Sequence, residues 1–204
     1  MYQRFLKRII DIIIGLIALP FVLLVVVFCA PIIWMTDRGP VFYNAIRSGK
    51  NYHPFTMFKL RSMYVNSPDL KNPDGSTFNS DNDSRVTPIG RFMRKTSLDE
   101  FPQFLNVLLG DMSFVGPRPK LYIGEEAYDG FSDDIKKSFQ VKPGITGYAQ
   151  AYYRNSITQE EKFRWDAYYV DHVSFRMDLK ILWKTFVSVL GHKNINTEQS
   201  LKNK

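Results

Sequence analysis

The sequence contains very little cysteine: Cys29 is the only one in 204 residues, and it lies inside an apolar stretch. A single cysteine cannot form an internal disulfide, which excludes a small disulfide-stapled fold and suits a reducing compartment. No internal repeat is present. The length predicts one domain, with room for one appended segment.

A calcium-binding motif is also missing. The polar stretch from Asn66 to Pro88 contains Asp81-Asn82-Asp83, but an EF-hand frame would require glycine at Val86 and glutamate at Phe92. The many Asp, Asn, Ser, Pro and Gly residues of this stretch predict a surface loop.

Acidic residues are in the minority. The chain has 27 Lys and Arg against 20 Asp and Glu, a formal net charge of +7. This excess predicts an anionic partner such as nucleic acid, phospholipid or a phosphorylated metabolite. No groove-reading motif is present and an apolar N-terminus would go unexplained, so we do not expect nucleic acid to be the partner.

The longest apolar stretch runs from Ile9 to Met35 and is long enough to cross a bilayer. No small-residue cleavage site closes it, as one would close a signal peptide. Lysine and arginine occur on both flanks, whereas positive charge normally marks only the cytoplasmic side of a span. Pro20 removes a backbone hydrogen bond near the middle. We therefore favour a re-entrant helix that breaks at Pro20 and returns to the same face, with a plain span and a buried soluble helix as alternatives.

The next segment predicts a β-hairpin. Residues 39–47 and 54–62 alternate in polarity and flank the turn Ser48-Gly49-Lys50-Asn51. Near the C-terminus, Thr158 and Glu161 have the spacing of a capping box, which predicts the start of a helix. Residues 175–190 carry an apolar face that fits either a core helix or a helix in the membrane interface.

The candidate site is centred on the stretch from Thr96 to Pro119. Asp99 and Glu100 are adjacent there, at the start of a segment whose apolar residues recur at helical spacing. Pro102 is tolerated only in the first turn of a helix, and Gly110 is a suitable stop. Both carboxylates would therefore lie where backbone N–H groups and the helix dipole favour the ionised form. The alternative is that Ser97 and Glu100 form a capping box without chemistry.

Basic residues lie on both sides of this acidic pair in the sequence. Arg118 stands between two prolines that fix the backbone, so little entropy remains for its guanidinium to lose when it binds a phosphate. A solvated surface is the alternative for Lys59 and Arg61, and a rigid loop with a solvent-facing side chain is the alternative for Arg118. The candidate phosphate-binding residues are Lys59, Arg61, Arg91, Arg94, Arg118, Lys142 and Arg154.

A membrane element, two ionised carboxylates and several cations have to be explained together. Mg²⁺ prefers hard oxygen ligands and is often held by one or two carboxylates plus substrate phosphates. A carboxylate can also attack phosphorus, while cations neutralise the phosphate charge. Glycoside hydrolysis explains less, because its two carboxyl groups stand apart across a sugar and need no basic groups. The pattern favours phosphoryl transfer at a membrane surface, with Asp99 and Glu100 as metal ligands.

Six motifs spread over essentially the whole chain are similar to those of a known family. They are Lys7-Arg8-Ile9-Ile10-Asp11, Gly39-Pro40-Val41-Phe42, Phe58 to Met63, Ser97 to Glu100, Gly110 to Pro119 and Lys142 to Gly147. Together they resemble the small monotopic phosphoglycosyl transferases of bacterial polysaccharide and glycoprotein assembly.

The resemblance implies a Mg²⁺-dependent enzyme on the cytoplasmic face of the inner (plasma) membrane. It implies that Asp99 attacks the β-phosphorus of a UDP-sugar and releases UMP, and that polyprenol (undecaprenyl) phosphate then accepts the sugar phosphate. Glu100 corresponds to the residue paired with this nucleophile, where the Mg²⁺ sits. Arg118 corresponds to the family's Pro-Arg-Pro loop. The implied partners are the UDP-sugar, polyprenol phosphate and the lipid bilayer, and the sugar is not identified.

We expect an α+β fold, mostly helical, in a monotopic membrane protein. A re-entrant helix-break-helix would occupy residues 1–36, a cytoplasmic catalytic domain with interfacial helices and a small β-hairpin residues 37–190, and a polar tail residues 191–204. Family members often have a Ser-Pro pair at the membrane break, whereas Leu19 precedes Pro20 here. The alternative function is a non-catalytic, membrane-anchored scaffold that binds anionic phosphate ligands.

Overall fold

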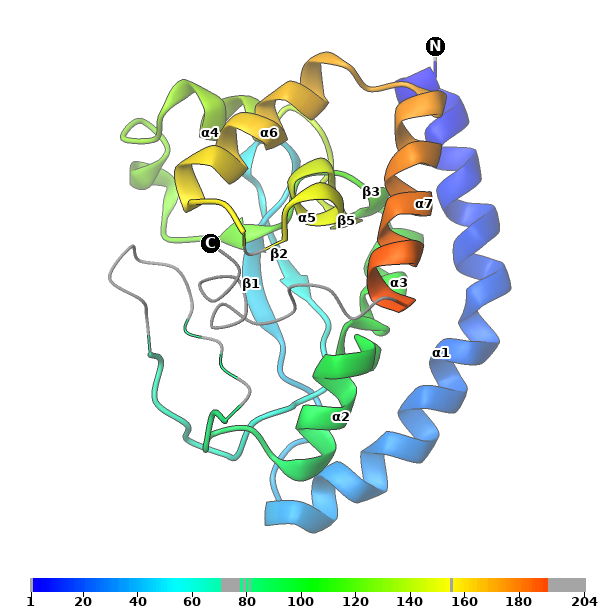
Figure 1. Ribbon diagram of the computed structural model, residues 1–204, viewed down its shortest axis with the longest axis vertical. Helices are drawn as coiled ribbons and strands as arrows, with labels where there is room; N and C mark the ends of the chain where they lie inside the picture. The colour runs from blue at the N-terminus through cyan, green and yellow to red at the C-terminus, as the bar shows by residue number, and fades with distance from the viewer. Residues whose placement is uncertain (1, 71–77, 79, 81, 155, 191–204) are drawn as a thin grey trace.

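The computed structural model describes residues 2–70, 78, 80, 82–154 and 156–190. The predicted polar tail, residues 191–204, lies outside the described residues. The structure combines helices with two small sheets, as expected for an α+β fold, and a single long helix forms one edge of the molecule (Figure 1).

This long helix is α1 (Lys7–Asp37), which follows a π-helical turn at Tyr2–Leu6. By length and composition it could cross a membrane: its most apolar window has a mean hydropathy of 3.2 and is only 17% buried. The expected break at Pro20 is absent, because α1 continues through both Pro20 and Pro31. A proline bends a helix without ending it when the neighbouring backbone hydrogen bonds are kept. Accordingly, Figure 1 shows α1 as one bowed helix.

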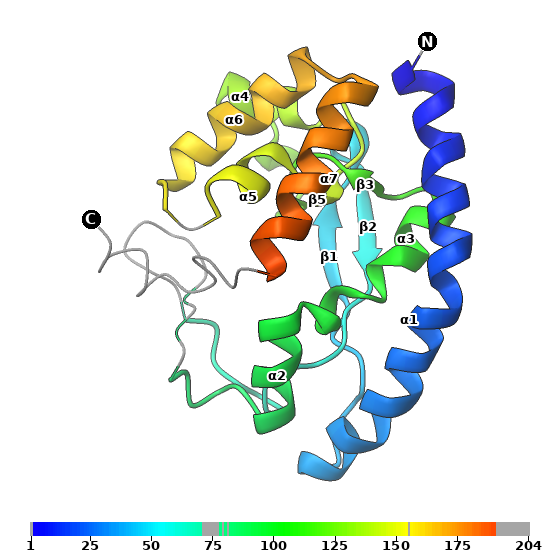
Figure 2. The same ribbon diagram turned by 45° about the vertical axis from the view of Figure 1, so that its right-hand side comes forward.

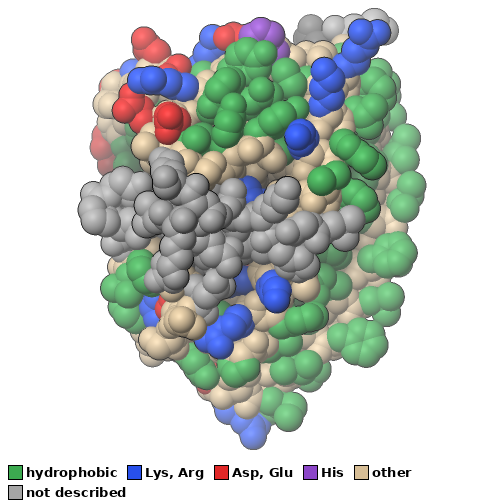
Figure 3. Space-filling view, viewed as in Figure 1, with side chains coloured by type: hydrophobic (Ala, Val, Ile, Leu, Met, Phe, Trp, Pro, Cys, Tyr) green, Lys and Arg blue, Asp and Glu red, His purple; other side chains and the backbone are tan. Residues whose placement is uncertain are grey.

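One side of α1 packs against the rest of the protein. The buried residues recur at intervals of four and seven, which defines a single stripe along the helix: Asp11, Gly15, Val22, Cys29 and Ile33. The remaining surface is apolar and exposed, with Ile17 at 66% and Phe28 at 69%. Figure 3 shows this surface as a green band along the edge formed by α1. An exposed apolar surface of this kind is typical of a site that contacts a membrane or another protein.

The predicted hairpin is present. Strands β1 (Ala45–Ser48) and β2 (Pro54–Met57) pair in antiparallel fashion across a 3₁₀ turn at Lys50–Tyr52. A third strand that the sequence did not indicate, β4 (Lys120–Leu121), pairs with the other edge of β1. The segment that follows Arg118 is thereby held beside the hairpin.

A second, parallel sheet pairs β3 (Ser113–Val115) with β5 (Gly144–Thr146). Glycines make the close approach possible: a Cβ on Gly144 would overlap the backbone nitrogen of Gly116, and one on Gly147 would overlap the carbonyl oxygen of Gly116. In addition, the N–H of Gly144 donates to the carbonyl of Pro117 at 2.9 Å. This backbone contact fixes the start of the Pro-Arg-Pro loop.

The remaining helices surround these sheets. They are α2 (Pro88–Thr96), α3 (Gln103–Leu109), α4 (Asp133–Ser138), α5 (Tyr148–Tyr152), α6 (Gln159–Asp171) and α7 (Phe175–Leu190), with 3₁₀ turns at Leu98–Glu100 and Glu125–Ala127. Helices α4, α5 and α6 lie at one end of the molecule, and α2 lies near the C-terminal end of α1 at the other (Figures 1 and 2). The predicted capping box of Thr158 and Glu161 opens α6.

Helix α7 has the bounds that its pattern predicted, and part of its predicted apolar face is open, while Leu182 of that face packs against the core. Leu179, Trp183 and Phe186 are 57%, 65% and 56% exposed. The opposite side of α7 carries Ile181, which is fully buried, and Asp178. Of the two alternatives for this segment, the structure therefore favours a helix with one open apolar face.

A buried carboxylate joins three parts of the chain. Asp178 accepts hydrogen bonds from the hydroxyls of Tyr2 (2.5 Å) and Tyr169 (2.7 Å) and forms an ion pair with Lys7. Because burying a carboxylate is favourable only when its oxygens are paired, this network specifies how the N-terminus, α6 and α7 meet.

The glycine contact leads to a first prediction. Gly144→Ala should lower the thermal unfolding midpoint by several degrees, since an added methyl group in a filled site costs about 1–3 kcal/mol. Gly130→Ala is the matched control, because a Cβ there would have its nearest neighbour at 3.7 Å. Scanning fluorimetry of both variants at one heating rate tests this, and equal midpoints for the two would contradict it.

Candidate active site

Asp99 and Glu100 lie in the 3₁₀ turn Leu98–Glu100, between α2 and α3. Ser97 ends α2 in the left-handed conformation (φ 59°), which turns the chain sharply just before the acidic pair. The Ser97 side chain makes no capping hydrogen bond, so the capping-box alternative is not formed. Asp99 is 3% exposed. A carboxylate buried in this way needs a partner.

Helix α3 follows directly and has the predicted end. Its first residue, Gln103, comes after Pro102, and it stops at Gly110, which has φ 100°. The predicted start near Asp99 is correct in position, but the first turn is 3₁₀ rather than α: the N–H of Glu100 donates to the carbonyl of Ser97 at 3.2 Å. The acids therefore precede the α-helix instead of forming its first turn.

Asn106 of α3 fixes the acidic pair against the hairpin. It is fully buried; its Oδ1 accepts from the N–H of Phe58 (2.9 Å), and its Nδ2 donates to the carbonyl of Thr56 (2.8 Å). The N–H of Leu60 donates to the carbonyl of Asp99 at 3.0 Å. These bonds place the segment after β2 alongside the acidic turn, with Lys59 between the bonded residues.

Two cations neutralise the acidic pair. Lys59 Nζ lies 2.7 Å from Asp99 Oδ2 and 3.9 Å from Glu100 Oε1, and Arg118 Nη2 lies 2.8 Å from Glu100 Oε1. Burial would raise the pKa of Glu100, but the charges of Arg118 and Lys59 outweigh it and hold this pKa at about 2. Glu100 is thus ionised at neutral pH. The side chain of Arg118 is 55% exposed, so it also remains accessible from solvent.

Arg94 also belongs to this site. It is partly buried, its Nε donates to Ser62 Oγ at 2.9 Å, and the charge of Asp99 opposes the lowering of its pKa by burial. Three of the sequence-predicted cations, Lys59, Arg94 and Arg118, are therefore brought together around the two carboxylates.

Arg61 has a different role. Its two terminal nitrogens each donate to Asp37 at 2.6 Å and its Nε donates to the carbonyl of Pro40. This guanidinium is 6% exposed and engaged on every side, so we assign it to anchoring the end of α1 rather than to phosphate binding. The sequence could not show this, because Asp37 lies 24 residues away.

The other three predicted cations are not gathered at the acidic pair. Lys142 lies at the far end of α3: a Cβ on Gly110 would lie 3.5 Å from its amine and 3.4 Å from Arg8. Arg91 is exposed on α2 and Arg154 is partly buried after α5. Among the described residues, neither of these arginines forms a hydrogen bond or ion pair with Asp99 or Glu100.

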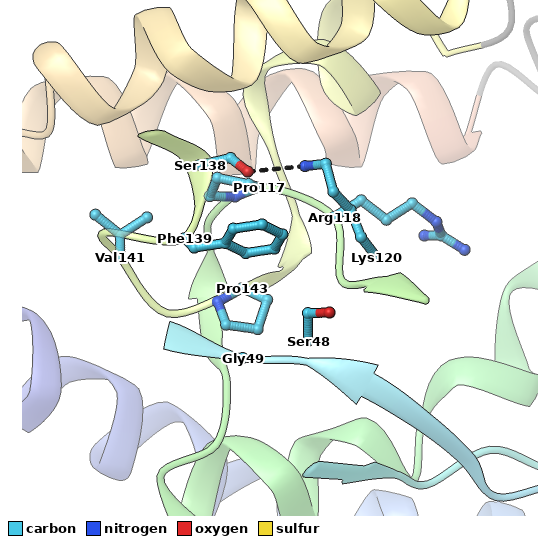
Figure 4. Close-up of a pocket in the computed structure, with 9 residues that line it drawn as sticks. All are labelled: Ser48, Gly49, Pro117, Arg118, Lys120, Ser138, Phe139, Val141 and Pro143. Carbon is cyan, nitrogen blue, oxygen red and sulfur yellow. Dashed lines mark hydrogen bonds between the residues drawn. The ribbon is translucent and has the colours of Figure 1, made fainter. Parts of the chain in front are cut away.

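The structure also reveals basic residues that the sequence reasoning missed. Lys120, two residues after Arg118, donates to Ser138 Oγ (2.9 Å) and forms an ion pair with Asp166 (3.3 Å). Figure 4 shows Lys120 and Ser138 joined in a small pocket that Arg118 also lines. Arg47 of β1 is a second such residue, and the positive charge of Arg118 contributes to lowering its pKa. In the sequence, only the alternation of polar and apolar residues along the predicted hairpin could have pointed to Arg47 as a site residue.

The donor set of the acidic pair fits a magnesium ion shared with a substrate. Lys59 contacts Oδ2 of Asp99 and Arg118 contacts Oε1 of Glu100, so each carboxylate has a second oxygen as a further potential ligand. The described residues contain no group of three His, Cys, Asp or Glu side chains that could hold a metal by themselves. Mg²⁺ is typically bound in this way, by one or two carboxylates together with phosphate oxygens of the substrate.

Comparison with known proteins identifies the family. A profile described as bacterial sugar transferase matches residues 2–192. The chain belongs to the bacterial sugar transferase family. This membership confirms the resemblance to phosphoglycosyl transferases that the motifs indicated. The matched residues include both α1 and the acidic pair.

Several curated family members are similar along most of this chain. An uncharacterized sugar transferase, EpsL, of Bacillus subtilis is 38% identical over 190 residues, which cover 93% of this chain and 90% of the relative. The undecaprenyl-phosphate galactose phosphotransferase of Salmonella typhimurium is 36% identical over 205 residues, 92% of this chain. The UDP-glucose:undecaprenyl-phosphate glucose-1-phosphate transferase of Escherichia coli is 37% identical over 188 residues, 90% of this chain. The matches cover only 41% and 40% of these last two proteins.

The charge pairing predicts a pH dependence. The folded-state pKa of Glu100, about 2, lies below its ordinary value of 4.5, so its ionised form stabilises the fold above pH 4.5 and this stabilisation is lost as the pH falls toward 2. Arg118→Gln removes the largest opposing charge and should raise the pKa of Glu100. Unfolding midpoints of the wild type and this variant should differ most above pH 4.5 and converge below it. A difference that is constant with pH would contradict the pairing.

Proposed function

We propose that this protein transfers a sugar 1-phosphate from a UDP-sugar to polyprenol phosphate and releases UMP. The observation that carries the proposal is the buried carboxylate of Asp99, held 2.7 Å from Lys59 and next to the Glu100–Arg118 ion pair. The names of the Salmonella and Escherichia relatives, which specify undecaprenyl-phosphate sugar transfer, support the same reaction.

In the first step, a carboxylate oxygen of Asp99 attacks the β-phosphorus of the donor. The bond from this phosphorus to the bridging oxygen breaks, and UMP departs with that oxygen and its electron pair. Asp99 suits this role because burial and the contact with Lys59 restrict its short side chain, so little orientational freedom remains to be lost. Arg118 can stabilise the equatorial phosphate oxygens with its planar fork.

In the second step, a phosphate oxygen of polyprenol phosphate attacks the phosphorus of the sugar-phosphoryl-aspartate. The acyl-phosphate bond breaks, the carboxylate of Asp99 is regenerated, and the product is a polyprenyl-diphosphate sugar. Splitting one transfer into two displacements is the advantage of a covalent nucleophile.

Glu100 and Asp99 would hold Mg²⁺ together with the donor phosphates. Such an ion supplies charge neutralisation to the diphosphate. Glu100 is suited to this because Arg118 and Lys59 keep it ionised. Its role differs from that of Asp99: Glu100 is partly exposed beside Arg118, whereas Asp99 is buried against Lys59.

The same proposal places the protein on the cytoplasmic face of the inner membrane, with α1 entering and leaving the bilayer on one side. Both ends of α1 are tied to the same domain, through Lys7 to Asp178 and through Asp37 to Arg61. A straight span would carry its two ends to opposite sides of the membrane. The two ends anchored to one domain therefore favour the re-entrant arrangement, although α1 continues through Pro20 without a break.

The nucleophile is tested by mass spectrometry of protein given a UDP-sugar and Mg²⁺ but no polyprenol phosphate. A sugar-phosphate adduct is expected on the peptide containing Asp99; it should be absent in Asp99→Asn, because an amide is a poor nucleophile, and absent when Mg²⁺ is chelated. Glu100→Gln should cut UMP release by at least about 100-fold, the scale of losing one electrostatic group in an active site.

Three results would count against this assignment. Turnover by Asp99→Asn or an adduct on Glu100 would reverse the roles of the two acids. Full activity in excess chelator would show that the reaction does not need Mg²⁺. No UMP release from a panel of UDP-sugars would favour the non-catalytic scaffold.

Topology has its own test. Tags fused before Met1 and after Lys204 should both report the cytoplasmic side. Pro20→Leu restores the missing backbone bond and should shift part of the population toward a full span. Tags on opposite sides in the wild type would refute the re-entrant arrangement.

A further inference from the structure

Arg47 is a cation with a buried, unsatisfied donor. Its Nε is shielded from solvent and has no hydrogen-bond partner, and no ion pair joins its guanidinium to any carboxylate in the part of the chain that the structure describes. Leaving a buried charged donor unpaired is unfavourable, and native proteins rarely do so without a functional reason.

The strand pairing places Arg47 next to the Pro-Arg-Pro loop. Arg47 lies opposite Leu121 in the β1–β4 ladder, and β4 begins two residues after Arg118. The two residues that follow Arg47, Ser48 and Gly49, line one pocket together with Arg118 (Figure 4). The positive charge of Arg118 acts on Arg47, adding to the effect of burial in lowering its pKa.

The charges of this region do not balance by themselves. Lys59 and Arg118 are already paired with Asp99 and Glu100, while Arg47 and Arg118 are like charges held near each other. Like charges held near each other repel, Asp69 offsets only part of this repulsion on Arg47, and an anion bound between the two guanidinium groups would relieve it. Arg118 interacts with both Glu100 and Asp99, whereas the charged and polar groups acting on Arg47 are Arg118, Tyr43 and Asp69. Arg118 forms an ion pair with Glu100 at 2.8 Å, whereas Arg47 forms no ion pair with either acid among the described residues.

We infer that Arg47 binds the nucleotide phosphate of the donor, the group that departs as UMP, while Arg118 binds the phosphate that is transferred. This inference rests on the proposed function and adds to it a second phosphate-binding residue. The two guanidinium groups would grip the diphosphate on either side of the bond that breaks, and each can form two parallel hydrogen bonds to phosphate oxygens.

The alternative is a purely structural role, in which the alkyl stem of Arg47 packs beside its strand neighbours Leu121 and Phe55. This alternative predicts a change in stability but no dependence on the phosphate of a ligand. A comparison of UMP with uridine separates the two roles, because the ligands differ only in that phosphate.

The experiment is calorimetric titration of the purified full-length protein with UMP and with uridine. Arg47→Gln should weaken UMP binding about tenfold or more, the scale of a hydrogen bond to a charged group, and leave uridine binding unchanged. Arg47→Lys keeps the positive charge but loses the planar guanidinium, so its UMP affinity should lie between those of the wild type and Arg47→Gln. The control is Arg164→Gln, because Arg164 is exposed and paired with Glu160 on α6; it should bind both ligands like the wild type.

An equal loss of UMP and uridine affinity, or UMP binding by Arg47→Gln within twofold of the wild type, would overturn the inference. If Arg47→Gln does not fold, Arg47→Lys decides: an unchanged ratio of UMP to uridine affinity overturns the inference, and a reduced ratio supports it. UMP release from UDP-sugars is assayed separately. Arg47-dependent UMP binding without release would support the nucleotide site and refute the transfer.

Discussion

The docking of α1 is the constraint on which the rest of the structure depends. Arg8 donates to the carbonyls of Val107 (2.5 Å) and Leu108 (2.8 Å) at the end of α3, and Asp11 accepts from the N–H of Phe114 at 3.1 Å. Hydrogen bonds to charged groups contribute about 1.5–3 kcal/mol each. These bonds, together with the buried stripe along α1, set where α1 meets the domain. Because α3 starts just after the acidic pair, the same bonds position the site relative to α1.

Much of the site's local structure follows from the sequence. Pro102 and Gly110 place α3 within a few residues, because a proline excludes one end of a helix and a left-handed glycine favours the other. The hairpin follows from alternation around Gly49, and Arg118 was singled out by its flanking prolines. Each of these signals depends only on neighbouring residues, so no knowledge of the tertiary structure was needed.

What the sequence could not supply depends on distant contacts. The strands β3, β4 and β5 have two or three residues each, too few for any periodic pattern. Arg61 was assigned to phosphate because its partner, Asp37, ends a helix in another motif. Pro20 was expected to break α1, but a proline can equally bend a helix, and the packing around it decides between the two.

The contact of Gly116 with Gly144 and Gly147 has a consequence for how the site responds to its surroundings. The ion pair between Glu100 and the half-exposed Arg118 weakens when salt is added, and it weakens when the pH falls toward 2. The glycine contact joins backbone atoms and carries no charge, so neither change acts on it. The base of the Arg118 loop therefore keeps its place under conditions that loosen the guanidinium itself. Charge therefore determines how tightly the Arg118 side chain is held, whereas the uncharged glycine contact determines where its backbone lies.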